Sequence, residues 1–142
     1  TDGKPVTTIA LGDQVDVHLK FRGLTDEYLD SGALLDLLPG GFELVVPQTP
    51  AASDEEDPQR YTGWRCQICV GNARAMLQYA DMREDRVVFY VNATRDVSEI
   101  VYRIKATNVG SYVTPPAYGE AMYDRSVVAR SAAGKMEVTR KE

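Results

Sequence analysis

The chain has 142 residues and a formal net charge of −5 at pH 7. This length fits one domain, which can bury roughly 70% of the surface that its unfolded chain exposes and therefore needs no metal to fold. An acidic chain without a basic stripe is a poor candidate for nucleic-acid binding, which depends on neutralising phosphates. No segment approaches the roughly 20 consecutive apolar residues of a membrane span, so we expect no membrane insertion.

Residues 14–22 give the first clear strand signal. Apolar side chains alternate there with polar ones: Val15, Val17, Leu19 and Phe21 share one face, and His18 falls on the polar face. This period of two predicts a half-buried antiparallel strand. The same alternation returns at residues 98–106.

Shorter segments complete the prediction of an all-β domain. An apolar run that ends at Pro39 is interpreted as a buried strand, and the β-branched and aromatic run 87–91 as a strand central in the fold. Further candidates lie at residues 112–113, 126–130 and 135–139. Seven to nine short strands separated by turn signals indicate a mainly β fold, an antiparallel β-sandwich.

One segment has the spacing of a helix. Asn72 can cap its start, and Ala73, Met76, Leu77 and Ala80 follow at positions i, i+3, i+4 and i+7, which predicts a short α-helix over about residues 72–82. We treat residues 1–142 as a single domain. Within it, residues 1–11 are expected to be a ragged N-terminus, and the Pro- and acid-rich residues 47–60 a mobile loop.

Cys66 and Cys69 form an isolated C-x-x-C. A zinc site needs four ligands, and His18, the only histidine, cannot complete one. A thioredoxin-like redox pair belongs in a βαβ pattern, which is absent around these residues. The favoured interpretation is a local disulfide or two unpaired thiols in an extracytoplasmic domain, and the sequence leaves these two alternatives open.

The sequence contains no convincing catalytic or cofactor-binding motif. A nucleophile elbow, a phosphate loop and an H-E-x-x-H pair are all absent, and any triad would have to use His18 from a solvent-facing strand position. We therefore expect a protein that is not an enzyme and that uses no cofactor or metal.

Residues 113–126 do not have the composition of an ordinary solvent-exposed connection. The segment contains Tyr118, Met122 and Tyr123. Tyrosine and methionine are enriched where a surface meets a partner, although such side chains also fold back onto a domain's own core.

Four motifs make the sequence recognisable. They are LLPGGFE at residues 37–43, MREDRVVFY at 82–90, YRIKATN at 102–108 and PPAYGEAMYDRSV at 115–127. Their order and spacing over residues 12–138 resemble the C-terminal, receptor-binding-like macroglobulin domain (MG10) of bacterial α2-macroglobulins.

The resemblance implies a domain of a large periplasmic protease inhibitor, free or anchored to the inner membrane, that traps attacking proteases after they cleave a bait region. Many members carry a Cys–Gln thioester in a C-x-x-Q motif, and the C-terminal domain packs against the thioester domain and helps lock the native state. Carried onto this chain, the family's M-Y-D segment places the locking contact at Met122 and Tyr123, with Tyr118 and Asp124 in support. The implied partners are neighbouring domains of the parent chain and, through the parent, proteases.

The chain also departs from the family pattern. Cys69 stands where a thioester would need Gln, so Cys66 cannot form that bond within the domain. Residues 59–75 match no family motif and are a candidate contact site for other periplasmic proteins. Two further hypotheses remain: an independent adhesion or carbohydrate-binding β-sandwich, and a redox enzyme that uses Cys66 and Cys69.

Overall fold

The computed structural model describes residues 5–46, 66–70 and 76–141. These residues form eleven strands and no helix. The strands are β1 (Thr8–Ala10), β2 (Gln14–Phe21), β3 (Leu29–Leu37), β4 (Phe42–Leu44), β5 (Met76–Met82), β6 (Arg86–Ala93), β7 (Ser98–Ala106), β8 (Gly110–Thr114), β9 (Tyr118–Ala121), β10 (Val128–Arg130) and β11 (Gly134–Thr139). In the described part of the chain, no helix is long and apolar enough to cross a membrane.

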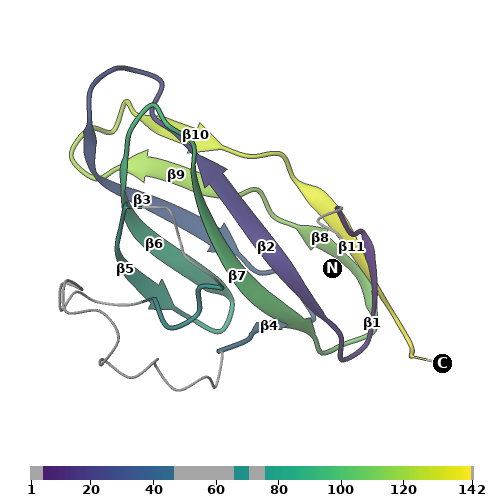
Figure 1. The fold of residues 1–142 in the computed structure, drawn as a ribbon. Helices are drawn as coiled ribbons and strands as arrows, with labels where there is room; N and C mark the ends of the chain where they lie inside the picture. Colours follow the sequence, from purple (N-terminus) through teal and green to yellow (C-terminus); the bar gives the residue numbers. More distant parts are fainter. Residues whose placement is uncertain (1–4, 47–65, 71–75, 142) are drawn as a thin grey trace, which may run out of the picture.

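The strands form three sheets. A five-stranded sheet has the order β10-β9-β3-β6-β5, and two three-stranded sheets have the orders β2-β7-β4 and β1-β11-β8. Every pair is antiparallel except β1 with β11, which is parallel. Strands β2 and β7 lie in front of the five-stranded sheet, and β8 and β11 extend the front layer to one side (Figure 1). This arrangement is an immunoglobulin-like β-sandwich, as the alternating strands predicted.

The core lies between β6 and β7. Strand β7 alternates strictly between buried and half-buried residues, and β6 buries Val87, Phe89 and Val91. The rings of Phe89 and Tyr102 meet with their centroids 5.7 Å apart, which joins the two layers. A period-two sequence thus gives each strand one face that is removed from water.

Three expectations were wrong. The described part of the predicted helix 72–82, Met76–Met82, is strand β5, whose partner is β6 along its whole length. The strands number eleven in the described residues rather than seven to nine. Residues 1–11 are not simply a ragged end, because Thr8–Ala10 pair with β11.

The connection around residues 113–126 is also more ordered than predicted. Its middle part, Tyr118–Ala121, is strand β9, which pairs with β3 on one side and β10 on the other. The acidic loop 47–60 and most of residues 59–75 lie outside the described residues.

Candidate functional site

The predicted contact residues Met122 and Tyr123 begin the turn between β9 and β10. Met122 is 50% exposed and Tyr123 is 87% exposed. Burial of an aromatic ring is one of the larger favourable terms available to a fold, and the domain leaves this one in water.

The turn that carries these side chains is fixed by hydrogen bonds. The Asp124 carboxylate accepts bonds from the backbone N–H and the hydroxyl of Ser126, at 3.0 and 2.6 Å. These bonds hold the pKa of Asp124 below its ordinary value. The backbone of the turn closes through N–H groups of Val127 and Ala121, which donate to the carbonyls of Asp124 and Val127. Asp124 therefore supports the turn directly.

A second anchor ties the turn to β3. The N–H of Met122 donates to the carbonyl of Ser31 at 2.9 Å. Ser31 has a φ of 63°, in a register shift of β3 between Leu29 and Gly32. Its own N–H donates to the side-chain oxygen of Asn92 at 3.2 Å, and Gln78 donates to the same oxygen at 2.8 Å. This irregular backbone positions the carbonyl that holds Met122.

The sequence analysis missed Ser31 and Asn92 as positioning residues. A signal for Asn92 existed, because asparagine is depleted in strands and this one follows a run of five β-branched and aromatic residues. Nothing in the sequence marked Ser31, because serine gives no warning of a left-handed backbone conformation.

The structure separates Tyr118 from the turn. Tyr118 lies at the start of β9, opposite Arg130 of β10. Its hydroxyl donates to Glu120 at 3.1 Å, and the Arg130 guanidinium lies 5.8 Å from the ring centroid. The hydrogen bond to Glu120 raises the pKa of the Tyr118 hydroxyl. Tyr118 thus contacts its own hairpin, at the opposite end of β9 from Met122 and Tyr123.

The structure joins Cys66 and Cys69 in a disulfide. Between them, Ile68 is fully buried, and the backbone of Cys69 forms an isolated antiparallel β-bridge with that of Tyr102 in β7. The disulfide therefore closes a short segment whose apolar side chain enters the core.

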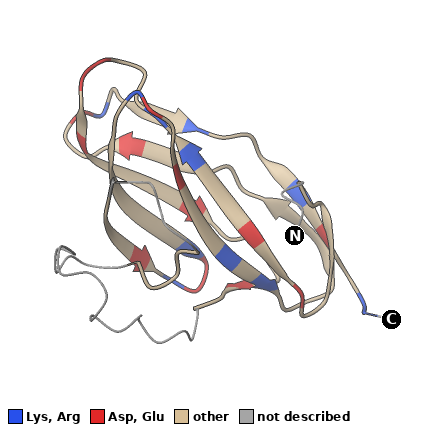
Figure 2. Cartoon of the chain, viewed as in Figure 1, with Lys and Arg blue, Asp and Glu red and all other residues tan. Residues whose placement is uncertain are grey.

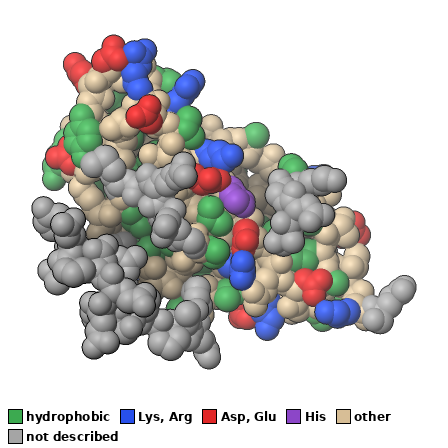
Figure 3. Space-filling view, in the orientation of Figure 1, with side chains coloured by type: hydrophobic (Ala, Val, Ile, Leu, Met, Phe, Trp, Pro, Cys, Tyr) green, Lys and Arg blue, Asp and Glu red, His purple; other side chains and the backbone are tan. Residues whose placement is uncertain are grey.

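The two other chemically suggestive places have local explanations. His18 is exposed on the face shown in Figure 3 and lies 2.8 Å from a Glu99 oxygen. Asp36 is buried and accepts a 2.6 Å hydrogen bond from Tyr102; burial raises the pKa of Asp36, and burial together with the carboxylate raises the pKa of Tyr102. Both pairs connect strands of the sandwich.

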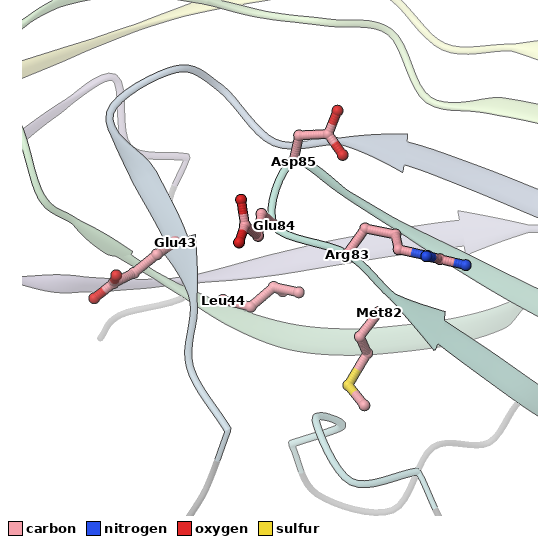
Figure 4. A pocket seen from close by; sticks show the side chains of 6 residues that line it. All are labelled: Glu43, Leu44, Met82, Arg83, Glu84 and Asp85. Carbon is pink, nitrogen blue, oxygen red and sulfur yellow. The ribbon is translucent and has the colours of Figure 1, made fainter.

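A shallow pocket lies between β4 and the turn from β5 to β6 (Figure 4). Leu44 and Met82 line it together with Glu43, Glu84, Asp85 and Arg83. Two of its charged side chains have partners outside the pocket lining, because Asp85 pairs with Arg86 and Arg83 pairs with Asp81. Among the described residues, no group of acidic, histidine or cysteine side chains has the arrangement of a metal site.

Comparison with known proteins decides the family. The family model of the bacterial α2-macroglobulin MG10 domain matches residues 1–125. The chain belongs to this family. An α2-macroglobulin homolog of Yersinia pestis is 46% identical over 134 residues, and the α2-macroglobulin of Pasteurella multocida is 36% identical over 138 residues.

The MG10 domain is a small part of these relatives. The match covers 91% and 96% of this chain but only 7% and 6% of the two relatives, so the chain spans under a tenth of their length. Native Escherichia coli α2-macroglobulin, solved from domain MG7 to its C-terminus, matches 99% of this chain and 22% of that chain, with a TM-score of 0.72 and 26% identity. The macroglobulin fold that the four motifs implied is thus confirmed.

Proposed function

We propose that this MG10 domain docks through Met122 and Tyr123 onto the thioester-type domain of a bacterial α2-macroglobulin and helps hold that protein in its native state. One observation carries the proposal: two large apolar side chains, 50% and 87% exposed, stand on a turn whose backbone is fixed by several hydrogen bonds. A contact that is already ordered loses little conformational entropy when it docks.

The chemistry of these side chains suits the proposed role. A thioester survives in water only where hydroxide and amines are kept away. Methionine and an aromatic ring exclude water and bring no amine of their own. In a parent without a thioester, the same contact would act only as a domain clasp. Neither version of the role requires catalysis by this domain.

The proposed parent is a periplasmic, broad-spectrum protease inhibitor. An E. coli α2-macroglobulin described as activated by porcine elastase matches 97% of this chain with a TM-score of 0.72. The Cys66–Cys69 disulfide supports a location outside the reducing cytoplasm, because structural disulfides persist in oxidising compartments.

The test uses the full-length parent protein with Met122→Ala and Tyr123→Ala combined. If the parent carries C-x-x-Q, methylamine should release its thiol at least about tenfold faster in the variant, because each 1.4 kcal/mol of lost protection is tenfold. If it does not, limited proteolysis should cut the junction before this domain faster.

The matched control is Val109→Ala with Val113→Ala, which removes two side chains that are 47% and 62% exposed outside the turn. The control should behave as the native protein does. A double variant at Met122 and Tyr123 that is indistinguishable from the control in both assays would contradict the proposal.

A further inference from the structure

The β9–β10 turn is one of three loops that gather at the same end of the sandwich. The others are residues 22–28, between β2 and β3, and residues 94–97, between β6 and β7. All three lie at the upper left of Figure 1. We call them together the loop end.

The three loops are connected to one another. The N–H of Gly23 donates to the carbonyl of Thr94 at 2.6 Å, and Arg95 forms an ion pair with Asp26. The third loop reaches this assembly through β3, because Met122 donates to Ser31 and the pair Leu29–Ala93 joins β3 to the end of β6. Hydrogen bonds, an ion pair and strand pairing thus link the three loops.

Large apolar side chains are exposed in each of the three loops. Leu24 is 83% exposed, Val97 is 61% exposed and Tyr28 is 51% exposed; in the β9–β10 turn they are joined by Val127 at 45%, besides Met122 and Tyr123. A single exposed leucine needs no explanation, but six large apolar side chains on connected loops are typical of a surface that meets a partner.

We propose that the whole loop end is one docking surface, in which Leu24, Tyr28 and Val97 extend the contact made by Met122 and Tyr123. Its occupant is an apolar surface of another domain in the same parent chain. This inference rests on the proposed function, and it adds a second and third loop to the contact.

The length of the relatives argues for an occupant within the chain. This domain makes up 7% and 6% of two relatives, so more than nine-tenths of such a protein lies outside it. A tethered neighbour is present at a high effective concentration and covers an apolar surface without a free partner. Interfaces between domains bury roughly 600–1,500 Å². The six side chains include two tyrosines, each of which can bury at most about 150–250 Å², so they fit the apolar centre of an interface of the smaller kind.

Charge contributes little to this choice of partner. The three loops carry four acidic side chains and three basic ones, and Asp26 and Arg95 already neutralise each other. Figure 2 shows acidic and basic residues close together at this end. Docking should therefore depend on apolar area and respond only weakly to salt.

The experiment compares three variants of the full-length parent. The first combines Leu24→Ala, Tyr28→Ala and Val97→Ala, the second combines Met122→Ala and Tyr123→Ala, and the third is the control at Val109 and Val113. The readout is methylamine-driven thiol release, or proteolysis at the junction where the parent has no thioester, at low and high salt. The unfolding midpoint of each 142-residue chain tests that the fold is intact.

We expect the first variant to be at least about threefold faster than the control at both salt concentrations. If the first variant matches the control while the second is faster, the inference is wrong and the proposed function stands. If both match the control, both are wrong. If the native 142-residue chain forms a dimer by light scattering and the first variant does not, the occupant is a second copy, and the inference is again overturned.

Discussion

The two ends of the sandwich treat a tyrosine in opposite ways. At the end away from the loop end, the hydroxyl of Tyr112 donates to the carbonyls of Asn108 and Val109 at 3.2 Å, and its ring packs edge-on against Phe42 at 6.2 Å. At the loop end, Tyr123 is 87% exposed. The domain can therefore pack a tyrosine beside a turn where small neighbouring residues leave space for the ring. Tyr123 is not packed in this way.

The space for the Tyr112 ring exists because residue 41 is a glycine. Gly41 has a φ of 77°, and a Cβ there would lie 2.7 Å from the Tyr112 hydroxyl oxygen and closer still to Cζ. We expect Gly41→Ala to lower the free energy of unfolding by about 2–5 kcal/mol, from backbone strain and the clash together. Urea denaturation of the 142-residue chain measures it.

Gly12 supplies the matched control for this prediction. It has a φ of 86°, but a Cβ added there would meet nothing within 4 Å, so Gly12→Ala should cost only the backbone strain, about 1–2 kcal/mol. If the two variants lose the same free energy of unfolding, the packing of Tyr112 against Gly41 contributes nothing measurable to stability.

The Cys66–Cys69 disulfide stabilises a segment that belongs to neither end of the sandwich. Cys66→Ser with Cys69→Ser should lower the free energy of unfolding by about 2 kcal/mol, because the open segment gains freedom in the unfolded chain. Two interactions of this segment should then weaken first. They are the hydrogen bond from the N–H of Val70 to the carbonyl of Val101, at 2.7 Å, and the burial of Ile68. A reducing agent should reproduce the loss in the native chain and change nothing in the double variant.

The buried Asp36, which lies between the two ends of the sandwich, makes the free energy of unfolding depend on pH. Burial raises the pKa of Asp36 above its ordinary value of 3.8, so the folded state holds the proton more tightly than the unfolded state. The stability that this proton provides is present at acid pH and is lost as pH rises from about 4 through the folded pKa.

Asp36→Asn removes this titration and keeps an oxygen that can accept the Tyr102 hydrogen bond. Relative to the native chain, the variant should gain stability as pH rises from about 4 to 7, because the native carboxyl group must ionise in a buried position and the amide does not. Urea denaturation at several pH values between 4 and 7 measures the difference. A difference that does not change with pH would contradict the assignment to Asp36.

The elements that the sequence predicted well are those whose pattern reaches the core without interruption. Residues 14–22 alternate strictly and residues 98–106 alternate except at Val101. They contain β2 and β7, paired from Gln14–Lys105 to Phe21–Ser98. The prediction of a helix where the structure has strand β5 was wrong for a specific reason. The register of β5 shifts between Leu77 and Tyr79, so two exposed residues separate Leu77 from the buried Ala80. This spacing of three imitates a helix.

Strand β9 was hidden by its composition. Gly119 lies so close to Leu34 that a Cβ there would be 3.0 Å from a Leu34 methyl carbon, which explains the glycine and removes the side chain that would reveal the pattern. At the loop end, the family resemblance led to the prediction that Met122 and Tyr123 are contact residues, and this stays a prediction. The proposal for Leu24, Tyr28 and Val97 needed the structure, because only the fold brings their loops to the same end.

The smallest expected effect concerns the candidate site itself. Met122→Ala with Tyr123→Ala should change the free energy of unfolding of the 142-residue chain by less than about 0.5 kcal/mol, because both side chains are mostly in water and the bonds of the turn come from Asp124, Ser126 and the backbone. The opposite end would respond differently, since truncation of Tyr112 removes packing against Phe42. A loss above about 1 kcal/mol at Met122 and Tyr123 would mean that these residues serve the fold of the isolated domain. A loss near zero, combined with faster thiol release or proteolysis in the full-length parent, separates docking from folding at the same two residues.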